Sequence, residues 1–119
     1  MQSHTSLEAW REARRVVLEV LDFSRTGWRP WAGAVFHQLQ RASLSVQLNI
    51  AEGYARGPGR SAAYFYNVAY GSAVETGDLL GLLSDAALAD VGQAAPMIQR
   101  NRRCQALVLG LLKRAGEQE

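Results

Sequence analysis

The chain has 119 residues, of which 48% are hydrophobic and 20% are charged, and its formal net charge is +2. This length allows one buried core but not two, so we expect a single domain over residues 1–119. No apolar run reaches the roughly 18–20 residues that a membrane-spanning helix needs, so no membrane partner is expected. The first residues lack the basic and apolar segments of a secretion signal, and Cys104 has no second cysteine for a disulfide. We therefore expect a cytoplasmic protein.

The first predicted helix covers about residues 6–25. Thr5 and Glu8 have the spacing of a capping box, in which each side chain accepts a hydrogen bond from the other residue's backbone. Apolar residues recur at steps of three and four from Trp10 to Leu21, which is the period of one helix face. Gly27 is expected to cap the carboxyl end of this helix.

Three further helices are predicted, over about residues 32–56, 61–88 and 93–115. The glycine-rich segment 56–60 separates the first two of them, and Ser61 is the expected N-cap after it. Residues 90–93 form the last connection, and Pro96 is acceptable in the first turn of the fourth helix. Four helices joined by short links predict an all-α protein, an antiparallel up-down-up-down four-helix bundle.

Glycines inside the predicted helices need an explanation, because each costs about 1 kcal/mol relative to alanine. They are Gly53, Gly71, Gly77, Gly81 and Gly110. Close approach between helices, within the bundle or between subunits, would offset this cost. Gly53 and Gly71 are therefore candidate assembly contacts.

Polar residues follow one side of the second predicted helix and continue on the third. They are Ser45, Asn49, Glu52, Ser72 and Glu75. The preferred interpretation is a hydrogen-bond network that fixes the register of the two helices. The alternative is a ligand-binding or enzymatic pocket in which Glu52 and Glu75 act as a pair of acids. Neither histidine follows an acid at the spacing used by di-iron bundles, so no metal, cofactor or catalytic residue is assigned.

Segment 41–56, with the sequence RASLSVQLNIAEGYAR, resembles the family of four-helix-bundle proteins associated with intervening sequences of bacterial 23S ribosomal RNA genes. Residues 7–13, 60–65 and 69–75 are also similar to that family, the last through its G-S-x-x-E pattern. Gln47 stands where the family often has proline, and Tyr70 where it has a basic residue. The resemblance implies a cytosolic bundle that assembles into a homopentameric ring, without a known enzymatic activity. A more distant branch binds nucleic acid and works with reverse transcriptases.

Charge is unevenly distributed along the chain. Residues 61–90 contain four acidic and no basic residues, which gives them a charge of −4, so the rest of the chain sums to +6. Basic surfaces attract nucleic acid. The candidate contacts are Arg11, Arg14, Arg15, Arg56, Arg60, Arg100, Arg102 and Arg103. The alternatives are a solvated helix face, pairing with the acidic helix of another subunit and, for the loop at 56–60, an ordinary turn.

The loop after the first helix contains Trp28 and Trp31, which either form an assembly contact or cap the core of their own bundle. Cys104 lies on an apolar stripe, so buried packing is expected of it rather than nucleophilic chemistry. The preferred function is a non-enzymatic protein that forms a homo-oligomer, with the ring of five taken from the resemblance. A nucleic-acid-binding accessory is the first alternative, and the Glu52/Glu75 pocket is the second. No small-molecule substrate is identified.

Overall fold

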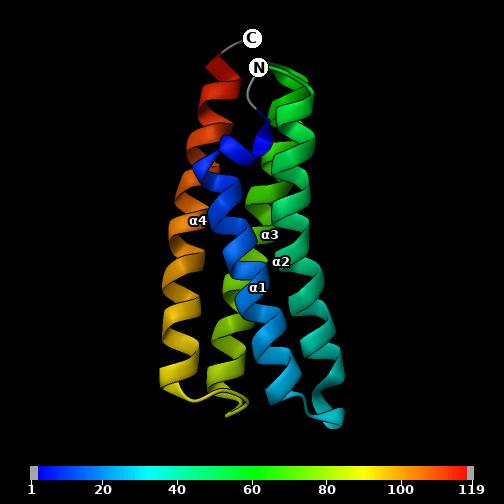
Figure 1. Cartoon of the computed structure of the whole chain (residues 1–119), viewed down its shortest axis with the longest axis vertical. Helices are drawn as coiled ribbons and strands as arrows, with labels where there is room; N and C mark the ends of the chain where they lie inside the picture. The colour runs from blue at the N-terminus through cyan, green and yellow to red at the C-terminus, as the bar shows by residue number, and fades with distance from the viewer. Residues whose placement is uncertain (1–2, 118–119) are drawn as a thin grey trace.

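The computed structural model describes residues 3–117, and in this range it contains four α-helices and no strand (Figure 1). The helices are α1 (Glu8–Gly27), α2 (Gly33–Ala55), α3 (Arg60–Asp85) and α4 (Val91–Glu117). Single 3-10 turns, η1 (His4–Ser6) and η2 (Pro30–Ala32), precede α1 and α2. The predicted all-α fold is confirmed, and each helix boundary lies within three residues of its expected position.

The helices lie side by side in a shape of 45 × 22 × 22 Å, and each packs against two others (Figure 1). The contacting pairs are α1 with α2, α2 with α3, α3 with α4, and α4 with α1, which is consistent with a bundle. Gln38 of α2 contacts Glu75, whereas Ser45, later in α2, contacts the earlier Ser72. Contacts between these two helices therefore run in opposite directions along the sequence. None of the helices in residues 3–117 combines the length and apolarity needed to cross a membrane.

The core is built from stripes of mainly apolar residues that recur at the helical period. Phe36, Leu39 and Ile50 of α2 are completely buried, as are Leu80 and Leu83 of α3. Burying such a side chain stabilises the folded chain by roughly 1.5–3 kcal/mol. The stripes are sufficient to hold the four helices together around one apolar centre.

Three expected helix caps are wrong. Leu7, whose side chain makes no capping hydrogen bond, is the N-cap of α1, so Thr5 and Glu8 do not form a capping box. Gly27 is the last residue of α1 and has no left-handed conformation; its lack of a Cβ instead makes room for the ring of Phe23. Gly59, with φ of 114°, replaces Ser61 as the N-cap of α3, because the turn before this helix needs a positive φ.

A capping box that was not predicted begins α4. The carboxylate of Asp90 accepts a hydrogen bond from the backbone N–H of Gln93 at 2.8 Å, and the Gln93 side chain accepts one from the backbone of Asp90 at 3.2 Å. The signal was present as Asp-x-x-Gln before an apolar stripe, which is a variant of the usual capping-box pattern.

Candidate functional site

The polar side of α2 meets α3 through a small hydrogen-bond cluster. The hydroxyl groups of Ser45 and Ser72 lie 2.8 Å apart. The Asn49 amide donates to the backbone carbonyl of Ser45 at 2.8 Å and to its hydroxyl at 3.1 Å. All three side chains are partly buried, so the cluster fixes one turn of α2 opposite one turn of α3.

The two glutamates expected in this network lie outside it. Glu52 is exposed and pairs with Arg56 at 2.9 Å, whereas Glu75 is exposed and accepts a hydrogen bond from Gln38. Gln38 and Glu52 are fourteen residues apart on α2, so a rise of 1.5 Å per residue separates the two acids by about 20 Å. The hypothesis that Glu52 and Glu75 form a catalytic or ligand-binding pair is therefore wrong.

Gly53 and Gly71 lie in different surroundings. A Cβ at position 53 would be 2.5 Å from Cε1 and 2.7 Å from Cδ1 of Tyr66, so Gly53 makes room for an aromatic ring of α3. Gly71 is exposed, and a Cβ there would meet no atom within 4 Å. Close packing within the chain thus explains Gly53, while nothing within the described chain requires a glycine at 71.

Glu12 of α1 lies at the centre of a cluster of charges between α1 and α4. Its side chain is buried and pairs with Arg15 at 2.9 Å, Arg100 at 3.2 Å and Arg103 at 3.1 Å. Burial alone would raise the pKa of Glu12, but the hydrogen bond from Arg15 and the charges of Arg100, Arg15 and Arg103 together lower it. The carboxylate is therefore ionised at neutral pH and holds the two helices together.

Two further glutamates of α1 extend this charge cluster. Glu19 lies 2.7 Å from Nε of Arg100, and Glu8 contacts the guanidinium of Arg103. Three acids of α1 thus face Arg100 and Arg103 of α4. Both arginines are thus paired with acids of the same chain, which weakens their attraction for phosphate groups.

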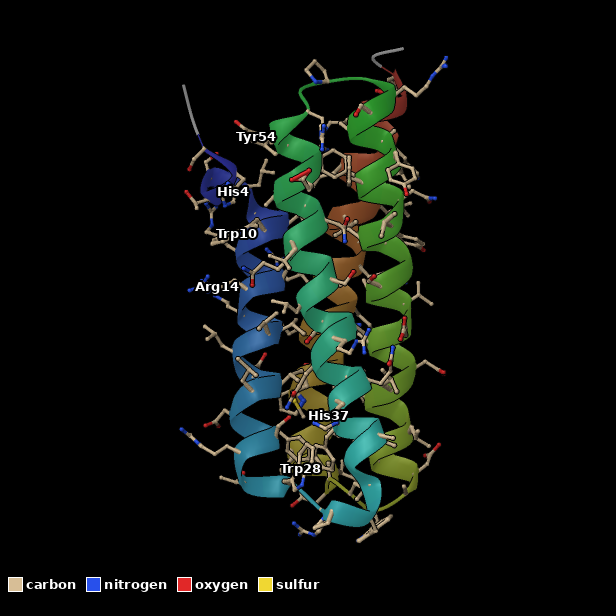
Figure 2. The ribbon with its side chains drawn as sticks, turned by 90° about the vertical axis from the view of Figure 1, so that its right-hand side faces the viewer. His4, Trp10, Arg14, Trp28, His37 and Tyr54 are labelled. Atoms are coloured by element: carbon tan, nitrogen blue, oxygen red, sulfur yellow. The ribbon has the colours of Figure 1, made fainter. Side chains whose placement is uncertain are left out.

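The other candidate arginines are spread over several surfaces. Arg11 donates to the backbone carbonyls of Thr5 and Ser6, and Arg14 lies over the ring of Trp10, 5.7 Å from its centre (Figure 2). At the other end of the sequence, Arg102 is exposed on α4.

Arg56 lies 5.0 Å from the ring centre of Phe65, and Arg60 is the first residue of α3. Of the eight arginines, Arg15, Arg100 and Arg103 thus meet at Glu12 between α1 and α4, whereas Arg56 and Arg60 lie at the two ends of the loop between α2 and α3.

The tryptophans of the first loop have separate roles. Trp28 is partly buried, with its ring centre 5.2 Å from that of Phe36 and 4.9 Å from that of His37, so it caps the core of its own bundle (Figure 2). Trp31 is 73% exposed. Of the two alternatives for this loop, core capping applies to Trp28, and only Trp31 is available to another molecule.

The outer faces of α1 and α2 carry partly exposed leucines, and one of them, Leu21, had been expected on the buried stripe of the first helix. Leu18 and Leu21 lie on α1, Leu44 and Leu48 lie on α2, and each side chain is between 43% and 53% exposed. Spacings of three and four residues place each pair on one face of its helix. The signal was the presence of leucine immediately beside the core stripes.

Cys104 is buried, with its sulfur 3.9 Å from the backbone carbonyl oxygen of Ala9. Burial, with a smaller effect of the Glu12 charge, raises its pKa to about 12. The thiol thus packs in the core and is not a nucleophile at neutral pH. Residues 3–117 contain no group of three or more His, Cys, Asp or Glu side chains arranged to hold a metal ion.

Comparison with known proteins identifies the family of this chain. No curated protein matches the chain. The sequence model of the 23S rRNA-intervening sequence proteins matches residues 5–110, which include all of α1, α2 and α3 and most of α4. Because this match covers most of the 119 residues, the chain belongs to the family of 23S rRNA-intervening sequence proteins.

Proposed function

We propose that the protein is a non-enzymatic cytoplasmic scaffold that assembles with copies of itself. The observation that carries this proposal is the half-exposed leucine pairs on the outer faces of α1 and α2. Completing the burial of each leucine would contribute about 1 kcal/mol to association. The exposed Trp31 adds a large apolar side chain of the kind that is enriched at protein interfaces.

The shape and charge of the molecule favour a ring. Residues 61–90, most of which belong to α3, sum to −4 while the rest of the chain sums to +6, so contact between α3 and a more basic part of another copy would bring opposite charges together. Contacts between two different surfaces close into rings when the rotation permits. Five copies are the number that the sequence resemblance implies. Within each copy we propose an antiparallel up-down-up-down bundle, which the opposite direction of the α2–α3 contacts supports.

Assembly is tested by light scattering coupled to gel filtration, between about 1 and 100 μM protein. The wild type is expected as one oligomer, and Leu44→Glu or Leu48→Glu is expected to weaken association by about 10-fold or more, because a charge would enter an apolar contact. Val91→Glu is the control, since Val91 is an exposed apolar residue at the start of α4 and belongs to neither helix that carries a leucine pair. A wild type that is monomeric at every concentration would overturn the proposal.

Nucleic-acid binding is the second candidate function. It is favoured by the net charge of +2 and by Arg102, which is exposed and has no ion pair with another residue of the described chain. Fluorescence anisotropy with labelled RNA and DNA should give affinities that fall steeply with salt and with Arg102→Glu. Arg103→Gln, which changes an arginine already paired with Glu8 and Glu12, should have a smaller effect. The absence of binding at low salt would refute this candidate.

A further inference from the structure

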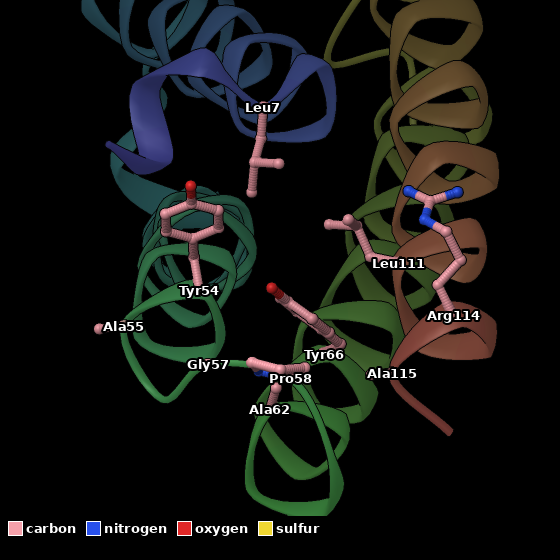
Figure 3. Close-up of a pocket in the computed structure, with 10 residues that line it drawn as sticks. All are labelled: Leu7, Tyr54, Ala55, Gly57, Pro58, Ala62, Tyr66, Leu111, Arg114 and Ala115. Carbon is pink, nitrogen blue, oxygen red and sulfur yellow. The ribbon is translucent and has the colours of Figure 1, made fainter. Parts of the chain in front are cut away.

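A cavity of about 700 Å³ opens at the end of the bundle where α1 and α3 begin and α2 and α4 end (Figure 3). Most of its described lining is apolar, with a few polar groups. This combination is typical of sites that bind small organic molecules. The lining residues on which the argument depends are Leu7, Tyr54, Tyr66, Leu111, Arg114 and Ala115.

Tyr66 provides a buried polar group inside this cavity. The residue is only 6% exposed, and its ring packs on the backbone of α2 at Gly53. Its hydroxyl points into the space bounded by Leu7, Tyr54 and Leu111, and it makes no hydrogen bond to another residue of the described chain (Figure 3). Burial and the neighbouring Tyr54 raise the pKa of Tyr66, so the hydroxyl stays protonated and is a hydrogen-bond donor. A donor that points into a mainly apolar cavity can bind an acceptor carried by a small molecule.

The surroundings of the cavity favour a negative charge. The guanidinium-bearing Arg114 is part of the lining, and no carboxylate is among the described lining residues. The chain enters α3 at the rim through Gly57 and Gly59, which have positive φ angles, and no side chain caps the first turn of this helix. Uncapped backbone N–H groups at the start of a helix attract anions.

We propose that this cavity binds a small organic monoanion with an apolar body, such as an aromatic carboxylate. The body would lie against Leu7, Leu111 and Ala115. The carboxylate would accept a hydrogen bond from Tyr66, and Arg114, whose guanidinium lies back along α4 near Gly110, would supply positive charge at the same end of the bundle (Figure 3). This site is separate from the leucine pairs that support self-assembly, so either proposal can fail without the other.

The test uses the full chain and two probes that differ in charge, 1-naphthaleneacetate and its neutral amide. Isothermal titration calorimetry is expected to give affinity for the acid about 10-fold higher than for the amide, because a hydrogen bond to a charged group is stronger. Arg114→Gln should weaken binding of the acid about 10-fold, and Tyr66→Phe, which keeps the ring, should weaken it about 5-fold. Lys113→Gln is the matched control, because Lys113 is an exposed cation next to Arg114 but outside the lining. The affinity of this variant for the acid should equal that of the wild type.

The outcomes that overturn the proposal are distinct. Equal affinity for acid and amide would remove the role of the charge, and tight binding of inorganic phosphate alone would remove the role of the apolar walls. An equal loss in Lys113→Gln and Arg114→Gln would indicate a general effect of surface charge. Failure of the acid to bind at millimolar concentration would also overturn it. Circular dichroism of each variant checks that the helices are retained.

Discussion

Alanine substitution at two helical glycines is expected to change stability in opposite directions. At position 71 the new Cβ would meet no atom within 4 Å, so Gly71→Ala gains only helix propensity, about 1 kcal/mol. At position 53 the same gain is opposed by the ring of Tyr66, because Cε1 would lie 2.5 Å from the new Cβ. Overpacking of this kind costs roughly 1–3 kcal/mol. The ring of Tyr66 would have to move away from α2, and the balance of this cost and the gain in helix propensity is a loss of up to about 2 kcal/mol for Gly53→Ala.

Urea denaturation followed by circular dichroism measures both variants, at one protein concentration so that any assembly contributes equally. The double variant Gly53→Ala/Tyr66→Leu is the internal control, since a smaller side chain at 66 relieves the overlap. Its two substitutions should therefore interact favourably in a double-mutant cycle. A Gly53→Ala protein as stable as Gly71→Ala would refute the reasoning, because it would mean that the contact with Tyr66 costs nothing.

Three further predictions concern groups buried between the helices. Glu12→Gln should destabilise the protein by about 1–3 kcal/mol at pH 7, because it leaves three arginines without their shared partner. Folding lowers the pKa of Glu12, so this carboxylate contributes to the free energy of unfolding above its unfolded pKa and loses that contribution as the pH falls through its folded pKa. The stabilities of the wild type and Glu12→Gln should therefore converge in acid. A constant difference in stability from pH 7 to 2 would contradict this. Ser72→Ala should cost about 1 kcal/mol in urea denaturation by removing the partner of Ser45, and no change would mean that the hydroxyl pair does not hold α2 to α3. Cys104 should react with a thiol reagent at pH 8 at least about 100-fold more slowly in the native than in the urea-unfolded protein, because its pKa is about 12 and the thiol is buried; equal rates would exclude a stably buried thiol.

The helices were predictable because their signal is local and repeated many times. Residues such as Leu39 and Ile50 recur at the helical period, and both are completely buried. Helix ends depend instead on the conformation of single residues. Gly59 has φ of 114°, and this value, rather than the capping preference of Ser61, decides where α3 begins. The capping box of Asp90 and Gln93 has a recognisable sequence pattern, Asp-x-x-Gln, but it was not predicted.

Contacts between helices were only partly predictable. The pattern within α2 indicated that Ser45 and Asn49 share one side, and the structure brings Ser72 of α3 to them. Glu52 belongs to the same side of α2 but lies beyond the cluster, beside Arg56. A helical period gives the direction of a side chain around its own axis but not its position along a neighbouring helix. For this reason the register between α2 and α3, and with it the separation of Glu52 from Glu75, could not be read from spacing alone.

The positions of helices relative to one another also decide which basic residues are paired with acids of the same chain. Summed along the sequence, Arg100 and Arg103 contribute to an excess of positive charge, but in the fold α1 brings Glu8, Glu12 and Glu19 against them. These ion pairs join α1 to α4. The outer faces of α1 and α2 instead carry half-exposed leucines, which gain free energy when another apolar surface covers them. Pairing Arg100 and Arg103 within the chain and leaving apolar side chains outside favours a protein that binds copies of itself over one built to attract phosphate.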